Sequence, residues 1–172
     1  MAVKSLDNVC QDKIYASVFE KYADDINRFF FYKYGNQVAA EEAVQEAFIK
    51  LWENCKTVPV EKAKSYLFTV ANNISLNAIK HQKVVLKYAK EQPQKKEDRQ
   101  DPAYKLEEEE FKQKLQQAIS ELKPKQRSTF LLHRIDGKTY KDIAEIENVS
   151  VKAIEKRMSQ ALTQLRQHIE QI

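Results

Sequence analysis

The chain has 172 residues, of which 42% are hydrophobic and 31% charged, so it can bury the core of one medium domain or of two small ones. Two glycines and four prolines are too few for a fold with many tight β-turns, and this composition favours long helices. The formal charge of +4 is unevenly spread, because residues 61–105 and 122–172 are net basic whereas residues 1–60 and 106–121 are net acidic. Basic blocks favour a polyanionic partner such as nucleic acid.

The sequence lacks the patterns of an enzyme, a metal protein or a membrane protein. Cys10 and Cys55 are too few for a disulfide framework, and with three scattered histidines they make no ligand set at zinc spacing. We therefore expect reduced thiols, no metal site and no cofactor. No apolar run approaches the length of a membrane span, which predicts a cytoplasmic protein whose only membrane link comes through a partner. No carboxylate pair, nucleophile–base set or glycine-rich phosphate loop is present, so no catalysis is expected.

Two helices are predicted in the first third of the chain. Residues 12–34 form the first, with Asp12 as its N-cap and Gly35 at the left-handed position that closes many helices. Residues 37–54 form the second, and the loop around Pro59 ends it. The apolar residues expected to face the core from the first helix are Ile14, Tyr15, Val18, Phe19, Tyr22, Ile26, Phe29, Phe30 and Tyr34.

The second helix has two distinct faces at helical spacing. One is apolar and is expected in the core; it consists of Val44, Ala47, Phe48 and Leu51. The other is acidic and amide-rich around one aliphatic residue; it consists of Glu42, Gln45, Glu46 and Ile49. This second stripe is either a solvated acidic surface or a docking face for a basic partner. From this helix alone, the solvated surface is the simpler interpretation.

Residues 65–85 predict a third helix with one apolar and one polar side. The apolar side consists of Leu67, Val70, Ala71, Ile74 and Ala78. The polar side consists of Asn72, Asn73, Asn77, Lys80, His81 and Lys83. Asparagine is a poor helix former, so this side is either an ordinary polar surface or a set of amides and cations that meets bases and phosphates. The neighbouring Tyr66 and Phe68 either pack in the core, which is the more common use, or stack on unpaired bases.

The segment 86–104 is highly charged, contains Pro93 and Pro102, and has no apolar period, which predicts a flexible linker between two helical domains. A helix over 106–122 follows, and Pro124 suits the first turn of the next one, which stops at Gly137. The buried residues expected in the helix over 106–122 are Phe111, Leu115, Ala118, Ile119 and Leu122. The predicted fold class is all-α, with domains over 8–85 and 105–170.

The last segment predicts a helix-turn-helix. A short helix over 139–145, capped by Thr139, is followed by a tight turn and a longer basic helix from Ser150 to about His168. Asn148 is expected to take the left-handed conformation that glycine usually supplies in this turn. The core face expected on the long helix consists of Ile154, Met158, Ala161, Leu162 and Leu165. The residues expected to contact DNA are Lys152, Glu155, Lys156, Arg157, Ser159 and Gln160. A plain helical hairpin is the alternative.

Taken in order, three stretches resemble a known family. They are AEEAVQEAFIKLW, SYLFTVANNISLNAIKHQK and, after the charged linker, AISELKPKQRSTFLLHRIDGKTYKDIAEIENVSVKAIEKRMSQALTQLR. Together they resemble the extracytoplasmic-function (ECF) sigma factors of the sigma-70 family of bacterial RNA polymerase, over about residues 14–166. The mix of features is closest to the iron-uptake-regulator-like branch of Bacteroidetes-type bacteria. The resemblance implies sigma region 2 in the first domain and sigma region 4 in the second.

The resemblance also implies roles for residues of this chain. The motif that grips the clamp coiled coil of core polymerase falls on Glu42, Gln45 and Glu46, with Ile49 adding apolar contact. The residues implied to contact the minus-ten element are Asn72, Asn73, Asn77, Lys80 and His81, with the loop over 58–64 as a pocket wall. The residues implied to contact the minus-thirty-five element are those already expected to contact DNA from the long helix. Arg127 matches the buried arginine that follows the family's Leu-Pro motif, here Leu122-Lys123-Pro124.

The expected function is therefore that of an alternative sigma factor, which binds core RNA polymerase, recognises both promoter elements and helps to open the DNA. The implied partners are the clamp and flap of core polymerase, promoter DNA, and an anti-sigma factor, which in this family is commonly anchored in the membrane. Two alternatives remain open at the level of sequence. One is a helix-turn-helix regulator that binds duplex DNA without polymerase, and the other is a helical adaptor whose partners are all proteins.

Overall fold

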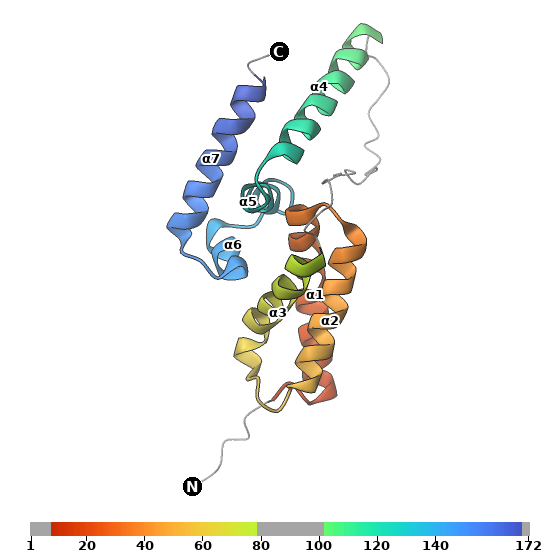
Figure 1. Ribbon diagram of the computed structural model, residues 1–172, viewed down its shortest axis with the longest axis vertical. Coiled ribbons are helices and arrows are strands. Elements are labelled where there is room, and N and C mark those ends of the chain that lie inside the picture. The colour runs from red at the N-terminus through yellow and green to blue at the C-terminus, as the bar shows by residue number, and fades with distance from the viewer. Residues whose placement is uncertain (1–7, 79–101, 170–172) are drawn as a thin grey trace.

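The computed structural model describes residues 8–78 and 102–169, and within them the chain is all-α, as predicted (Figure 1). Extended pairing in this part of the chain is limited to one isolated bridge between Asn8 and Pro59. None of the helices in these ranges combines the length and the hydrophobicity that a membrane span requires. The elements are α1 (Asp12–Tyr34), α2 (Gln37–Glu53), the 3-10 turn η1 (Val60–Lys62), α3 (Ala63–Ala78), α4 (Pro102–Glu121), α5 (Pro124–Arg134), α6 (Tyr140–Glu147) and α7 (Val151–Ile169).

Helices α1, α2 and α3 form the first unit, a small bundle. Gly35 ends α1 with φ 69° and donates its N–H to the Phe31 carbonyl, which is the left-handed termination that the sequence predicted. Asn36 then caps α2 by accepting the Ala39 N–H at 2.9 Å. The predicted N-cap Asp12 is wrong, because Asp12 is the first residue of α1 and the N-cap position falls on Gln11, whose side chain makes no capping bond.

The core of this bundle follows the predicted apolar stripes with one exception. Ile26, Phe29, Phe30 and Tyr34 of α1 are buried, and so are all four residues of the apolar face of α2. Phe19 was expected in the core but is 47% exposed. It lies at the rim of the helix pair, where its ring packs on Phe48 with 4.8 Å between centroids and leaves its other side to solvent.

Helices α4 to α7 form the second unit. Helix α4 packs against α7 through its C-terminal half, where Ala118 and Ile119 are buried with Leu122, Leu131, Ala161 and Leu165. Phe111 was expected in this core but is 46% exposed, because it lies nearer the N-terminal end of α4, beyond the buried cluster. Helix α4 also starts at Pro102, earlier than predicted, so its first turn overlaps the end of the expected linker. The rest of that segment lies outside the described residues.

The predicted helix-turn-helix forms from local side-chain chemistry. Thr139 caps α6 in a reciprocal capping box with Asp142, and the Ser150 hydroxyl accepts the Ala153 N–H at the start of α7. Between them Asn148 takes the left-handed conformation, with φ 51° and ψ 50°, as predicted. Ile143 and Ala144 face inward from α6 and meet Ile154 of α7. On the core face of α7 all the predicted residues are buried except Leu162, which is partly exposed.

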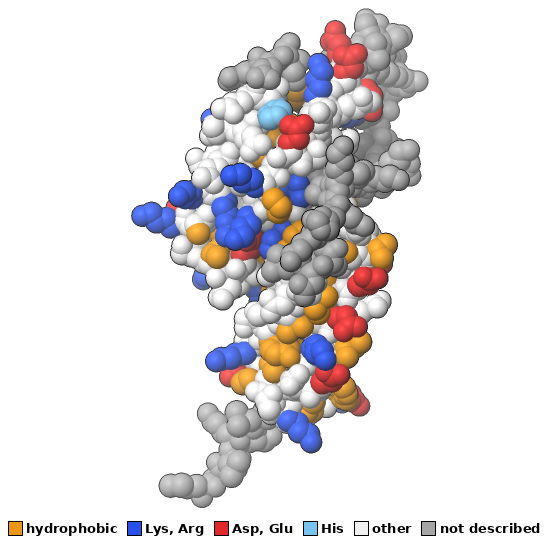
Figure 2. Space-filling model, in the orientation of Figure 1, with side chains coloured by type: hydrophobic (Ala, Val, Ile, Leu, Met, Phe, Trp, Pro, Cys, Tyr) orange, Lys and Arg blue, Asp and Glu red, His pale blue; other side chains and the backbone are white. Residues whose placement is uncertain are grey.

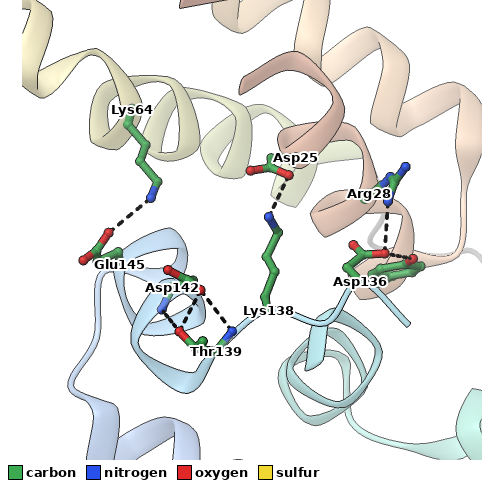
Figure 3. Close-up of polar contacts among 9 residues, drawn as sticks. Asp25, Arg28, Lys64, Asp136, Lys138, Thr139, Asp142 and Glu145 are labelled. Carbon is green, nitrogen blue, oxygen red and sulfur yellow. Dashed lines mark hydrogen bonds and ion pairs between the residues drawn. The ribbon is translucent and has the colours of Figure 1, made fainter. Parts of the chain in front are cut away.

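The two units pack against each other, an arrangement that the sequence left undefined. Helix α5 lies along α1, and α6 lies against α3. Three ion pairs bridge the units (Figure 3): Lys138–Asp25 at 2.9 Å, Arg28–Asp136 at 3.2 Å and Lys64–Glu145 at 3.3 Å. We call this packed arrangement the closed form.

Arg127 lies at the centre of the closed form and is 1% exposed. Its guanidinium donates to the Tyr32 carbonyl at 2.8 Å and the Lys33 carbonyl at 2.6 Å, both in the last turn of α1. It also donates to the carbonyls of Ser120 and Leu122 at the end of α4. Helix ends leave carbonyls without intrahelical partners, so one buried side chain satisfies the ends of two helices from different units.

A disulfide joins Cys10 to Cys55, which corrects the expectation of free thiols. The two residues are 45 positions apart in sequence, but α1 and α2 run antiparallel. The end of α2 thus returns to the start of α1 and places the two Cα atoms 4.9 Å apart. The bond and the bridge between Asn8 and Pro59 together fasten the segment before α1 to the loop before α3.

Reducing this bond, which closes a loop of 45 residues, should destabilise the first unit by about 4 kcal/mol, because the unfolded chain regains the entropy of an open loop. The measurement is urea unfolding of the chain with and without dithiothreitol. Cys10→Ser should reproduce the loss and should make the result independent of dithiothreitol. An equal response of the Cys10→Ser variant and the parent chain to dithiothreitol would contradict the assignment.

Candidate functional site: one docking face and two DNA-facing surfaces

The predicted docking residues share one exposed face of α2. Glu42, Gln45, Glu46 and Ile49 are all exposed, and Ile49 is 49% exposed despite its aliphatic side chain. We call these four residues the α2 face. Figure 2 shows acidic side chains interspersed with hydrophobic ones over the bundle that contains α2, whereas Lys and Arg gather over the second unit. The opposite side of α2 is buried in the core, so the residues of the α2 face do not contribute to core packing.

Trp52 extends the α2 face and was missed by the sequence analysis. It lies one turn after Ile49, is 47% exposed, and packs edge-on against Tyr15 with ring centroids 5.1 Å apart. Its spacing of three residues from Ile49 was a signal for this face. Exposed Trp and Ile within a charged surface are typical of a protein contact.

The polar side of α3 is only partly available to DNA in the closed form. Asn73 is exposed, whereas Asn72 is half-buried and accepts a hydrogen bond from the Lys33 ammonium at 2.8 Å. Asn77 lies within α3. Lys80 and His81 lie outside the described residues.

The aromatic residues at the start of α3 serve the core. Phe68 is 5% exposed and packs edge-on against Phe29, so the stacking role considered for it is excluded in this conformation. The Tyr66 hydroxyl donates to the Lys50 carbonyl at 3.3 Å. Val58, in the predicted pocket wall, is also buried.

The outer face of α7 carries the predicted upstream-element residues. Lys152, Glu155, Lys156, Ser159 and Gln160 are exposed in its first half. Arg157 is half-buried and forms an ion pair with Glu147 at the end of α6. Because α6 and α7 meet at a tight turn with α7 as the longer, basic helix, this unit has the geometry of a DNA-reading helix-turn-helix.

The closed form brings the two DNA-facing surfaces together. Asn72 from α3 and both Arg157 and Gln160 from α7 line one cavity of about 600 Å³ between the units. Gln160 accepts a hydrogen bond from Gln126 of α5 at 3.2 Å. The α2 face lies apart from this cavity. No cluster that suits a metal ion exists among the residues that the structure describes.

Two family models match the chain in the expected order. The model for sigma-70 region 2 matches residues 18–85, and the model for sigma-70 region 4 matches residues 112–165. The first covers most of α1 and all of α2 and α3, and the second covers the second half of α4, all of α5 and α6, and most of α7. The chain belongs to the sigma-70 family. It therefore acts as a sigma factor, which directs core RNA polymerase to promoter DNA.

One solved structure with low sequence identity shares the fold of this sigma factor. CnrH, solved in complex with the cytosolic domain of CnrY, aligns with a TM-score of 0.55 and 16% identity over 91% of this chain and 87% of that chain. A chain of the RsbN–BldN complex aligns at 16% identity over 91% and 92% of the two chains, with a TM-score of 0.35. No curated protein matches this chain. The assignment to the iron-uptake-regulator-like branch stays a prediction.

Proposed function

We propose that this sigma factor binds core polymerase through the α2 face. Four exposed side chains at helical spacing, two of them acidic and one aliphatic, support the proposal, because they serve no purpose in the core. A basic coiled coil is the partner that this chemistry fits best. In this scheme residues 8–85 form region 2, residues 86–104 the linker and residues 105–170 region 4. The chain has no catalytic role of its own and works in the cytoplasm.

We further propose that the polar side of α3 captures the minus-ten element. Asn72, Asn73 and Asn77 offer donors and acceptors to base edges, while Lys80 and His81 neutralise phosphate. Extruding a base from the stack costs a few kcal/mol, so a surface that holds the extruded base shifts the melting equilibrium. Region 2 thus contributes to opening the DNA without chemistry of its own.

The first half of α7 is the proposed reader of the minus-thirty-five element, with Lys152, Glu155 and Lys156 leading into the major groove and Arg157, Ser159 and Gln160 beside them. Asn72, Arg157 and Gln160 face one shared cavity in the closed form, whereas the two promoter elements are separate sites on DNA. The units therefore separate before both elements are bound.

A partner that restrains the factor is also part of the proposal. CnrH was solved with the cytosolic domain of CnrY. By analogy of fold alone, an anti-sigma factor, commonly membrane-anchored in this family, would hold this chain inactive by covering the α2 face or by keeping the units closed.

A reconstituted transcription assay tests the function directly. The purified chain is mixed with sigma-free core polymerase and a promoter that carries both elements. Specific transcripts should appear only when both protein components are present. Tight duplex binding that needs no polymerase would instead identify a helix-turn-helix regulator, and binding to proteins but never to DNA would identify an adaptor.

Lys156→Ala should weaken recognition of the minus-thirty-five element by about tenfold, because one base or phosphate contact is worth about 1–3 kcal/mol. Core binding should not change, since Lys156 is exposed on α7, away from the α2 face. The measurement is transcription from promoters with and without the upstream element. An equal loss on both promoters would contradict the assignment of Lys156.

A further inference from the structure

The cavity between the units has the size and the chemistry of a small-molecule site. Its volume of about 600 Å³ falls within the usual range of roughly 300–1,000 Å³ for such sites. It is lined from both units, by α1 and α3 on one side and by α5 and α7 on the other. A molecule bound there would touch both units at once.

Four of the nine residues that line the cavity are cationic. Lys33, Lys123, Lys125 and Arg157 all contribute, and the start of α5, where the helix dipole is positive, lies in the same wall. The carboxylate near them is Glu147, which pairs with Arg157 and accepts the Ser128 hydroxyl at 3.1 Å. Four positively charged residues therefore line the cavity, and no carboxylate is among the residues described as lining it.

The environment of Lys33 stabilises its positive charge poorly. Its side chain is buried, its ammonium lies over the rings of Phe29 and Tyr34, and it donates to Asn72. Burial lowers the pKa of Lys33, Glu147 opposes that shift, and the neighbouring Lys125 and Arg157 lower the pKa further. An anion in the cavity would offset both the desolvation and the mutual repulsion of these cations.

Tyr34 supplies an independent observation. It lines the cavity and is 9% exposed, and its hydroxyl has no hydrogen-bond partner among the described residues. A buried hydroxyl without a partner is costly, and such groups usually have one in native proteins. Burial also raises the pKa of Tyr34, which keeps its proton available for donation.

We propose that this cavity binds a small molecule through a phosphate group, with Lys125, Lys33 and Arg157 around the anion and the Tyr34 hydroxyl donating to it. A phosphate carries up to two negative charges and three acceptor oxygens, which suits several cations better than one carboxylate does. Bound across both units, the ligand stabilises the closed form. It also competes with promoter DNA, a consequence that rests on the proposed roles of Asn72, Arg157 and Gln160.

Calorimetric titration of the full chain with magnesium-free pyrophosphate tests the site, with sulfate as a comparison anion. Lys125→Gln and Tyr34→Phe should each weaken pyrophosphate binding by about tenfold, since a charge-assisted hydrogen bond of this kind is lost. Lys125→Arg should retain binding. Lys141→Gln, which removes an exposed lysine of α6 outside the cavity, is the matched control and should bind like the parent chain.

Tyr34→Phe provides a second readout. Without ligand, its melting temperature should equal or exceed that of the parent chain, because an unpartnered buried hydroxyl is removed; with pyrophosphate, its stabilisation should be smaller. Equal effects of Lys125→Gln and Lys141→Gln, equal affinity for sulfate and pyrophosphate, or unchanged binding by Tyr34→Phe would each overturn the proposal.

A transcription assay run without pyrophosphate distinguishes failure of the cavity proposal from failure of the proposed function. Polymerase-dependent transcription by a chain that does not bind pyrophosphate would overturn the cavity proposal alone. Binding with no polymerase-dependent transcription would overturn the proposed function alone.

Discussion

Arg127→Met should lower the free energy of unfolding by about 3–5 kcal/mol, the range for removing one partner of a buried charged network. The guanidinium satisfies four carbonyls, at Tyr32, Lys33, Ser120 and Leu122, and methionine can satisfy none. Burial lowers the pKa of Arg127 to about 10, so the side chain remains charged at neutral pH and its hydrogen bonds are charge-assisted. Urea unfolding followed by circular dichroism measures the loss.

The same substitution should also open the closed form, because two of the four carbonyls belong to α1 and two to the second unit. The two units should then unfold in separate transitions, and small-angle scattering should report a larger radius of gyration. Arg134→Met, at an exposed position of the same helix, is the matched control and should behave like the parent chain. A variant Arg127→Met within 1 kcal/mol of the parent would show that these bonds are not what holds the units together.

Gln45→Ala combined with Glu46→Lys should reduce affinity for core polymerase by at least about 100-fold, or about 2.7 kcal/mol. The substitutions remove an amide and place a cation where a basic partner is expected, so an attraction becomes a repulsion. Both side chains are exposed on α2, and the fold should remain intact. Fluorescence anisotropy of the labelled chain against core polymerase measures the affinity.

Two comparisons make this result specific to the α2 face. Glu20→Lys reverses a charge at an exposed site of α1 and should leave core affinity nearly unchanged. Circular dichroism of the double variant should match that of the parent. Core affinity within a factor of three of the parent would mean that polymerase docks elsewhere.

Much of the fold was predictable because its signals are local. The capping residues Thr139 and Ser150 and the left-handed Asn148 act within one turn of the chain, so the helix-turn-helix is encoded where it forms. The apolar period of α2 likewise assigns its buried side correctly. Periodicity cannot determine how much of an apolar stripe is buried, because that depends on where the neighbouring helix ends. Phe19 and Phe111 follow the apolar period but lie beyond the part of the stripe that neighbouring helices bury.

The remaining features depend on contacts between distant parts of the chain. The pairing of Cys10 with Cys55 follows from the antiparallel course of α1 and α2, and no spacing rule predicts it. The role of Arg127 in joining two units needs the position of α5 on α1. The residues proposed for the docking face could be predicted from the sequence alone, because exposure on one side of a helix is a periodic property. The sequence could not predict that Asn72 and Arg157 line the same cavity, because they belong to different units.

The position of Trp52 gives this protein a built-in optical signal. It is the only tryptophan in the chain, so its emission is not mixed with that of any other indole. Because the indole lies half in water at the end of the α2 face, covering that face would shift its emission to shorter wavelength. Unlabelled sigma factor can thus be followed onto a tryptophan-free fragment of the polymerase clamp in real time.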